Sequence, residues 1–448
     1  MFIKDEVEEF QRKRPRSHEL WKTAVKALAG GVSHNIRTFG LPTIGAFPVF
    51  VKSSKGANLT DIDDNSYIDC WNGHFAMILG HNHPRIREVI LQQINQGWHF
   101  GTTTDLQIRL SEQLITDNPG IEKIRFCTSG TEATMYACRL ARAYTGRRLI
   151  AKAKLGWHGA NDTLSYAVGG MLDDRSTPGI LEPQDAGIIT FDINSTDSIG
   201  RIKGLRENLA AVILEPVMGG GGGFSVNFEF LKELKEELDK MGALLIYDEV
   251  ITGYRFRYGL YQNVIKVIPD LTTMGKIIGG GFPIGAVGGQ HDIIDRAIPG
   301  RTNSVLIGGG TFSGFPVSLT AGLKTLELLR DSQAEYDRIN SAGELLKQNL
   351  NNYFREEKLP ILATGMGSIV MLHTLSEWIE DPSIPQIVKL TDKKRAALLQ
   401  LALFNRDIAG LHGLGCISMA HTKENVSQIQ QTVLEVASPI SSATDWPT

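Results

Sequence analysis

Two residues of this chain have the types and the spacing to carry out chemistry on an amine. Lys276 is followed by the glycine-rich turn 279–281, and Asp248 ends the apolar run 243–247, 28 residues before Lys276. A lysine in such a turn can form a Schiff base with an aldehyde, and a carboxylate at the end of a buried strand can keep a pyridine nitrogen protonated. The pair predicts a site for pyridoxal 5′-phosphate, whose ring accepts electrons from a substrate carbanion.

A short segment of small and hydroxylic residues could bind the phosphate of such a cofactor. Residues 129–133, Ser-Gly-Thr-Glu-Ala, follow an apolar run that ends at Cys127 and open a helical pattern. Backbone N–H groups at a helix N-terminus bind anions, and small residues allow close approach. The same letters are equally typical of a helix N-cap. Beside Asp248 and Lys276, phosphate binding becomes the favoured interpretation.

Two further segments follow strand-like runs. Trp157-His158-Gly159 provides an aromatic side chain that can stack on a planar ring, although core packing explains a tryptophan equally well. Glu215 ends another apolar run, and a carboxylate at the carboxyl edge of a sheet points into the crevice where ligands bind. A structural salt bridge is the alternative for Glu215.

Two residues outside these runs are candidates for binding a ligand. Thr311 lies in the turn 310–314, Gly-Thr-Phe-Ser-Gly, which ordinary turn formation before a helix would also explain. Arg37 would normally be assigned to the surface, but arginine is the usual bidentate partner of a carboxylate.

The elements that must position these residues alternate between strands and helices. Between residues 84 and 330, short apolar runs are separated by helical patterns; they lie at 123–127, 148–153, 187–191, 209–214 and 243–247. Continuously apolar strands with intervening helices predict a mostly parallel sheet that is buried on both faces. The segment 230–238 is an amphipathic crossover helix, which we expect Gly242 to cap.

The remaining parts of the chain predict a second, smaller domain. Residues 1–83 combine a helical stretch with short strands at 47–51, 57–63 and 67–70, and we expect them to pack with the small domain. Residues 331–448 contain helices near 335–356 and 392–408 and strands at 368–373 and 416–420. We therefore expect an α/β protein with an N-terminal segment 1–83, a large domain 84–330 and a smaller α+β domain 331–448.

Composition excludes several classes of protein. The chain has 448 residues, 42% of them hydrophobic, and a formal net charge of −3, which does not favour nucleic acid as a partner. The basic stretch 12–16 is interpreted as a solvated helix or arm. The four cysteines lack metal-type spacing and suggest reduced thiols in a cytoplasmic protein, without a bound metal. No apolar run approaches the roughly 18 residues that span a membrane, and the N-terminus lacks a signal segment.

The motifs together resemble the class III pyridoxal-phosphate aminotransferases of fold type I. The resemblance extends from about residue 27 to about residue 430, and it is carried by many ordered motifs: Asp61-Ile62-Asp63, residues 78–84, 129–133, 157–159, 215–217, 248–250, Lys276, 310–314 and 420–422. Within that class the chain is most similar to glutamate-1-semialdehyde 2,1-aminomutases and to the β-amino-acid aminotransferases near them. The segment from Gly30 to Arg37 and the segment 419–422 carry the similarity to that branch. The implied fold has a mostly parallel seven-stranded sheet.

The resemblance assigns roles around the cofactor. Lys276 is implied to be the Schiff-base lysine and the acid/base that moves the substrate proton, and Asp248 to pair with the ring nitrogen. Ser129, Gly130 and Thr131 are implied to contact the phosphate.

Other roles follow from the same resemblance. Trp157 stands where the family usually has a tyrosine stacked on the ring, and His158 belongs to the same motif. Glu215 is expected near the ring hydroxyl or the substrate. Thr311 is expected to reach the phosphate in the neighbouring subunit, which implies a homodimer. Arg37 matches an arginine expected to bind a substrate carboxylate.

The chain departs from the aminomutase pattern on the substrate side. A Trp-Gly-Pro segment is replaced by His74-Phe75-Ala76, a Gly-Asn-Met-Gly segment by the five glycines 219–223, and an asparagine by Phe315. The segment between Gly159 and Thr177 is also short. We therefore expect His74, Phe75 and Phe315 to line a substrate site together with Arg37.

These departures favour one function over its alternatives. We expect an aminotransferase that moves an amino group between a small-molecule donor, such as a β-amino or other non-standard carboxylate amine, and a keto acid or aldehyde acceptor. The alternatives are the intramolecular aminomutase that forms 5-aminolevulinate, a related racemase, and a non-catalytic cofactor-binding protein. The presence of Lys276, Asp248 and Glu215 argues against the last of these.

Overall fold

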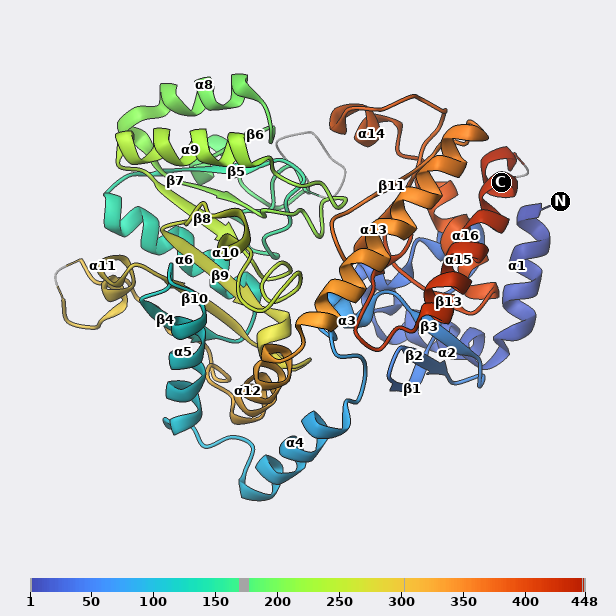
Figure 1. Cartoon of the computed structure of the whole chain (residues 1–448), viewed down its shortest axis with the longest axis horizontal. Coiled ribbons are helices and arrows are strands. Elements are labelled where there is room, and N and C mark those ends of the chain that lie inside the picture. Colours follow the sequence, from blue (N-terminus) through green and yellow to red (C-terminus); the bar gives the residue numbers. More distant parts are fainter. Residues whose placement is uncertain (1, 169–176, 302, 445, 447–448) are drawn as a thin grey trace. The chain divides into compact units, whose positions relative to one another are not determined.

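The apolar runs in the middle of the chain form the strands of one seven-stranded sheet in the computed structural model (Figure 1), with the order β4-β10-β9-β8-β7-β5-β6. The strands are β4 (Lys123–Cys127), β5 (Leu149–Ala153), β6 (Ile188–Phe191), β7 (Leu209–Leu214), β8 (Leu244–Asp248), β9 (Leu271–Gly275) and β10 (Gly285–Gly289). Only β10 runs antiparallel, to both β4 and β9. The mostly parallel sheet expected from the sequence is confirmed.

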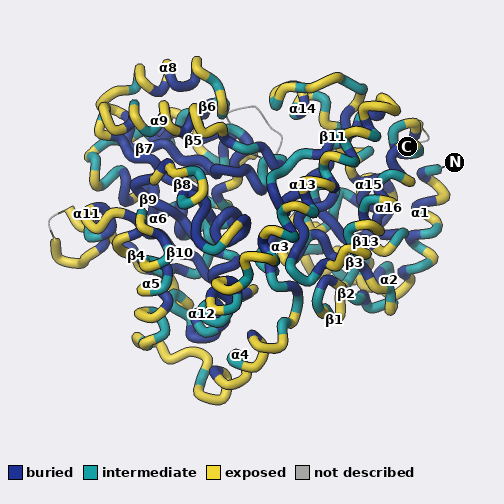
Figure 2. Tube along the Cα trace, viewed as in Figure 1, coloured by how far each residue is buried: buried dark blue, intermediate teal, exposed yellow. Residues whose placement is uncertain are grey.

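The central strands are buried along their whole length. Every residue of β7, β8 and β9 is buried, and Figure 2 shows these strands in the colour of buried residues. A strand covered on both faces has no polar face, which explains why these runs are continuously apolar in the sequence rather than alternating.

Helices connect and cover these strands. They are α4 (Pro84–Gln96), α5 (Asp105–Asp117), α6 (Gly130–Thr145), α7 (Pro183–Ala186), α8 (Thr196–Leu205), α9 (Phe228–Met241), α10 (Gln262–Ile265), α11 (His291–Ile294) and α12 (Pro316–Arg330). Helix α6 contacts β4, β7, β8, β9 and β10, so it crosses much of the sheet. Gly242 ends α9 in the left-handed conformation, as the sequence predicts.

The structure describes residues 2–168, 177–301, 303–444 and 446. Residues 169–176, which belong to the loop that the sequence indicates to be short, lie outside the described residues. The chain forms two compact units, one of residues 84–337 and one of residues 1–83 with 338–448. The boundary falls inside α13 (Gln333–Glu356), a few residues after the domain boundary at 330 suggested by the sequence. The three-part domain organisation remains a prediction.

The second unit combines two small sheets with helices. Its strands are β1 (Val51–Lys55), β2 (Asn58–Asp61), β3 (Ser66–Asp69) and β13 (Ile408–Ala409) in one sheet, and β11 (Ile361–Thr364), β12 (Ile369–Thr374) and β14 (Gly415–Cys416) in the other. Its other helices are α1 (Phe2–Lys13), α2 (Pro15–Ala27), α3 (Asn72–Phe75), α14 (Ile384–Leu390), α15 (Lys393–Asn405) and α16 (Lys423–Ser442). The parallel pairing of β13 with β3 joins the two ends of the chain in one sheet.

The expectation that the basic stretch 12–16 is solvated is wrong for one of its residues, whereas Arg12 and Arg16 are exposed. Arg14, in the basic stretch interpreted as solvated, is completely buried. Its guanidinium donates to the Tyr67 hydroxyl at 2.8 Å and to the carbonyl oxygen of Phe404 at 2.6 Å. A buried arginine is stable only when its donors are paired, and here it fastens the N-terminal helices to β3 and to α15.

Candidate active site

The carboxyl ends of five parallel strands meet at one edge of the seven-stranded sheet. β4 leads to Ser129, β5 to Trp157, β7 to Glu215 and β9 to Lys276, while Asp248 is the last residue of β8. Residues far apart in the sequence therefore lie along one edge, which is where open α/β sheets bind ligands.

Asp248 is buried and held by three donors. The side chain is 4% exposed. Its Oδ2 lies 2.8 Å from His158 Nδ1, and its Oδ1 accepts from the Thr273 hydroxyl at 3.0 Å and from the Val250 N–H at 3.1 Å. These contacts fix the orientation of the carboxylate. The sequence alone does not indicate Thr273 as a site residue, because only the pairing of β8 with β9 shows that it faces Asp248.

His158 supports Asp248. Burial lowers the pKa of the imidazole, and the Asp248 carboxylate opposes that shift. A neutral imidazole carries one proton, and the contact with Asp248 assigns it to Nδ1. Nε2 is buried and has no hydrogen-bond partner among the described residues.

Lys276 begins the short helical turn η5 (Lys276–Gly279) with φ of +49°, a conformation that costs free energy for a residue with a side chain. Burial lowers the pKa of its ammonium group and Arg255 adds to the decrease, whereas Asp248 and Glu215 oppose it. The residue is partly exposed, and within the described part of the chain its amine makes no hydrogen bond or ion pair. Among the described residues, Lys276 is therefore an amine without a partner that is more easily deprotonated than an ordinary lysine.

Glu215 joins two loops at the sheet edge. Its Oε1 accepts from the Trp157 N–H at 2.8 Å, and its Oε2 accepts from the Gly219 N–H at 3.0 Å. Burial raises the pKa of the carboxyl to about 8, and the Asp248 charge adds to the increase. The indole of Trp157 remains 42% exposed while its backbone is held in place.

The five-glycine loop packs against these segments with no room for side chains. A Cβ atom on Gly219 would lie 2.4 Å from Ile251 Cδ1, and one on Gly220 would lie 2.8 Å from Trp157 Cβ. A Cβ atom on Gly221 would lie 2.7 Å from the carbonyl oxygen of Leu155. Glycine at these three positions is therefore a steric requirement of the loop.

The segment at the start of α6 has both features that the sequence indicates, a helix N-cap and free N–H groups that can bind an anion. The Ser129 hydroxyl accepts from the Glu132 N–H at 3.3 Å, and Glu132 Oε2 accepts from the Ser129 N–H at 3.1 Å, so the helix has a capping box. The N–H groups of Gly130 and Thr131 have no acceptor among the described residues. A turn can be capped and still present two free donors to an anion.

Two glycines bring neighbouring backbone against this turn. A Cβ atom on Gly159 would lie 2.3 Å from Thr131 Oγ1, and one on Gly285 would lie 2.1 Å from the carbonyl oxygen of Ser129. The turn is therefore rigidly packed from β10 and from the segment after His158.

The two remaining residues of this unit that the sequence predicts for the site, Thr311 and Phe315, lie in the segment before α12. Thr311 and Phe312 are exposed. Phe315 precedes α12, with its ring centroid 5.9 Å from that of Phe312 and 6.1 Å from that of His99.

Arg37, His74 and Phe75 belong to the second unit. Arg37 is exposed on the short turn η2 (Asn35–Thr38). His74 and Phe75 lie in α3, where residues 72–75 have φ of +48°, +58°, +59° and +68° and thus form a left-handed turn. The Asp69 carboxylate holds that turn by accepting from the N–H groups of Trp71 at 2.9 Å and Asn72 at 3.1 Å. Strain of this kind is maintained only where surrounding contacts enforce it.

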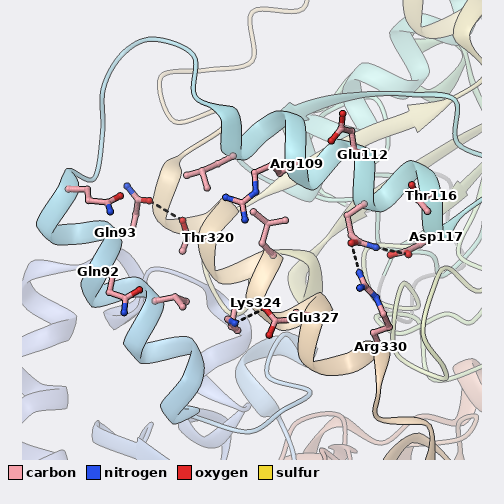
Figure 3. A pocket seen from close by; sticks show the side chains of 15 residues that line it. Gln92, Gln93, Arg109, Glu112, Thr116, Asp117, Thr320, Lys324, Glu327 and Arg330 are labelled. Atoms are coloured by element: carbon pink, nitrogen blue, oxygen red, sulfur yellow. Dashed lines mark hydrogen bonds and ion pairs between the residues drawn. The ribbon is translucent and has the colours of Figure 1, made fainter.

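A large hollow in the same unit is separate from this edge. It has a volume of about 830 Å³ and lies between α4, α5 and α12 (Figure 3). Polar contacts cross it from Thr320 to Gln93 and from Arg330 to Gln113. Lys324 pairs with Glu327 within α12, and Gln113 with Asp117 within α5. None of the residues expected from the sequence lines it.

Comparisons with known proteins identify relatives of the chain. The model of the aminotransferase class-III family matches residues 42–394. The glutamate-1-semialdehyde 2,1-aminomutase of Ignicoccus hospitalis is 40% identical over 385 residues, covering 85% of this chain and 87% of that protein. The solved structure of an omega-transaminase from Sphaerobacter thermophilus has a TM-score of 0.84 and 32% identity, covering 95% of this chain and 97% of the other. That of a beta-phenylalanine aminotransferase from Variovorax paradoxus has a TM-score of 0.85 and 26% identity, covering 98% and 97%.

Proposed function

Because the chain belongs to the class-III aminotransferase family, we propose that it is a pyridoxal 5′-phosphate-dependent aminotransferase acting through Lys276. One observation carries the proposal: a lysine of lowered pKa and a firmly held carboxylate, Asp248, lie at one edge of one sheet. The coenzyme itself would be held where these groups meet the start of α6.

The residues present fit this cofactor. Two free N–H groups at the start of α6 suit a phosphate, and the close packing of Gly159 and Gly285 against this turn holds those groups in place. Asp248 is buried with its orientation fixed, which suits pairing with a protonated ring nitrogen. Trp157 keeps an exposed indole that could cover a ring face. We assign Ser129, Gly130 and Thr131 to the phosphate on these grounds.

When bound, pyridoxal 5′-phosphate supplies an electron sink for the charge left on a substrate carbon that loses a proton. Lys276 Nζ would hold the cofactor aldehyde carbon and, once displaced by the substrate amine, remove the proton from the substrate carbon. Its lowered pKa keeps more of the amine neutral near physiological pH than an ordinary lysine would allow. Asp248 would hold a proton on the ring nitrogen, and His158 would keep Asp248 in place.

The substrate side favours transfer between two molecules. Arg37 is an exposed guanidinium suited to a carboxylate, and the His74–Phe75 turn and the five-glycine loop differ from the aminomutase pattern. We therefore propose a donor amine that carries a carboxylate, such as a β-amino acid, and a keto acid or aldehyde acceptor, with Arg37, His74, Phe75 and Phe315 as substrate-binding residues.

The second candidate is a glutamate-1-semialdehyde 2,1-aminomutase. It is favoured by the 40% identity to a relative of that name. Both candidates use the same Lys276 and Asp248, and they differ in whether a separate amino acceptor is needed.

One experiment separates them. The purified protein is loaded with pyridoxal 5′-phosphate and mixed with glutamate, alanine, β-phenylalanine or glutamate-1-semialdehyde, singly and with a keto acid. Loss of the visible absorption of the bound cofactor on adding an amine, with turnover only when a keto acid is present, supports the aminotransferase. Turnover of glutamate-1-semialdehyde without an acceptor supports the aminomutase. No change with any amine would contradict both.

We further propose that the chain acts as a homodimer in which Thr311 reaches the phosphate bound by the neighbouring subunit. Large apolar side chains are exposed around the segment of Thr311 and the connection from α4 to α5; they are Leu91, Trp98, Phe100, Ile108, Leu306 and Phe312, of which Leu306 is 83% exposed. A monomer rarely leaves so many large apolar side chains in water.

Light scattering on the wild type and on Leu306→Asp tests this proposal. We expect a dimer for the wild type and a shift toward monomer in the variant, with weakened cofactor binding. The control is Val264→Asp, on α10 and 37% exposed, which should remain a dimer. A wild-type monomer that binds the cofactor would contradict the proposal.

No helix in the described ranges is both long and apolar enough to cross a lipid bilayer. All four cysteines are free and buried. These thiols support the proposal of a reducing compartment such as the cytoplasm.

A further inference from the structure

Lys152, in the middle of β5, is a buried charge that the mechanism above leaves unused. Its side chain is 0% exposed, and its Nζ donates to the Ala153 carbonyl oxygen at 3.0 Å. An ammonium group has three donors, and a buried lysine is costly unless an opposite charge compensates it. Burial lowers the pKa of Lys152 to about 7, and the Glu215 charge opposes that decrease.

The strand register places Lys152 and Glu215 on the same face of the sheet. Lys152 pairs with Ile213 on the adjacent strand β7, and Glu215 follows Ile213 by two residues. Side chains two residues apart on a strand point to the same face, and diagonal neighbours on adjacent strands are within reach of a long side chain. Asp248 lies on that face as well, because Ile213 pairs with Ile246 on β8.

Glu215 needs a positive neighbour to remain ionised. Both of its oxygens accept hydrogen bonds from backbone N–H groups. A protonated Glu215 would have no acceptor for its O–H group among the described residues. The nearby Asp248 charge adds to the effect of burial in raising the pKa of Glu215. Lys276 is one positive group near Glu215, but its amine would be consumed when it holds the cofactor.

We propose that Lys152 is a positioning residue that acts through Glu215: its ammonium balances the buried carboxylate, which can then hold the backbones of Trp157 and Gly219. The titratable groups that interact with Lys152 are Glu215 and His158, and those that interact with Glu215 also include Asp248 and Lys276. The role in catalysis rests on the proposed function, whereas the charge pair itself can be tested without it.

The first test is a charge-pair cycle measured by urea unfolding of the protein without added cofactor. Lys152→Met leaves Glu215 as an unbalanced buried carboxylate, so the folded-to-unfolded ratio should fall by at least about 100-fold. Adding Glu215→Gln should recover most of that loss. The matched control is Lys154→Met, two residues further along the chain and just past the end of β5, whose partly exposed ion pair with Asp192 should contribute little.

Three results would overturn the pair: full stability of Lys152→Met, no recovery in the double variant, or an equal loss in Lys154→Met. If Lys152→Met does not fold, the test rests on the double variant with Glu215→Gln. Folding of that double variant supports the charge pair of Lys152 and Glu215, and its failure to fold overturns the pair.

The second test is the pH dependence of kcat/KM with a donor identified as above. Loss of the Lys152 charge raises the pKa of Glu215 further, so the acid limb of the profile should move to higher pH by about one unit or more in Lys152→Met. The shift should be absent in the Glu215→Gln background. The same shift in that background would show a merely structural role for Lys152 and overturn the positioning role. The double variant could recover stability while the wild type transaminates none of the donors. That outcome would contradict the proposed function but not the charge pair.

Discussion

His158 Nδ1 lies 2.8 Å from Asp248 Oδ2, and the two side chains are 1% and 4% exposed. Their strands are not neighbours, since β7 separates β5 from β8 in the sheet. The contact is possible because the chain turns back at the carboxyl end of β5 and brings His158 across the edge. Asp248 therefore has a fixed orientation before any ligand binds.

Asp248→Asn should keep the fold and lose most of the rate. The amide preserves the shape but cannot hold a proton on a ring nitrogen, so we expect kcat to fall on the order of 100-fold or more. Thr273→Val removes only one of the donors to Asp248 and should cost about fivefold. Steady-state kinetics check both, and equal effects of the two variants would argue against the role of Asp248.

Lys276→Ala should abolish turnover and the visible absorption of the covalently held cofactor, because alanine has no amine to form the Schiff base. The control is Lys232→Ala on the exposed face of α9, which should leave both unchanged. Retained activity in Lys276→Ala would contradict the assignment of Lys276.

Gly220→Ala should destabilise the protein and disturb Trp157. Its new Cβ would lie 2.8 Å from Trp157 Cβ, and overpacking of this kind costs about 1–3 kcal/mol. Gly200→Ala on α8 is the matched control, because its Cβ meets nothing within 4 Å and alanine favours a helix by about 1 kcal/mol. Thermal unfolding and tryptophan fluorescence measure the two effects. An unchanged fluorescence spectrum and unfolding temperature in Gly220→Ala would show that the loop is not packed as described.

The stability of the protein should fall as the pH drops from about 6.5 to about 4. Burial lowers the pKa of His421 to about 4, and its Nδ1 accepts from the Ser418 N–H at 3.1 Å. The unfolded chain therefore binds a proton in this range before the folded protein does. The contribution of His421 is fully present above the unfolded pKa and is lost toward the folded one, up to about 3 kcal/mol.

His421→Asn tests that dependence. Asparagine keeps an acceptor for Ser418 but does not titrate, so the pH dependence of the unfolding free energy between pH 4 and 6.5 should become flatter. An identical pH dependence in the wild type and the variant would exclude His421 as its source.

Much of the large unit could be predicted because its strands are locally distinct. The run 209–214 coincides with β7, since a strand buried on both faces is continuously apolar. The run 123–127 coincides with β4, whose polar residues Lys123 and Arg125 alternate with apolar ones. β10 was missed, because Gly-Ala-Val-Gly-Gly carries no strand signal. Contact with the backbone of its neighbours requires those glycines: a Cβ on Gly285 would lie 2.1 Å from the Ser129 carbonyl oxygen.

The second unit was harder to predict. The strand expected at 47–51 begins only at Val51, as β1, and only Gly415 and Cys416 form β14 where a strand was expected at 416–420. Short strands at a sheet edge depend on the partner that the fold brings to them, so apolar content alone does not locate their ends.

The sequence by itself determined which residue types are available for chemistry, since Lys276, Asp248, Glu215 and the Ser129 turn stand out by composition and by their place after apolar runs. Only the tertiary structure decided what each of them contacts. The order of the strands sets His158 against Asp248 and Lys152 on the face of Glu215. That order arises from packing between segments about 60 to 90 residues apart, and burial of those contacts, rather than any local pattern, shifts the pKa values of these groups.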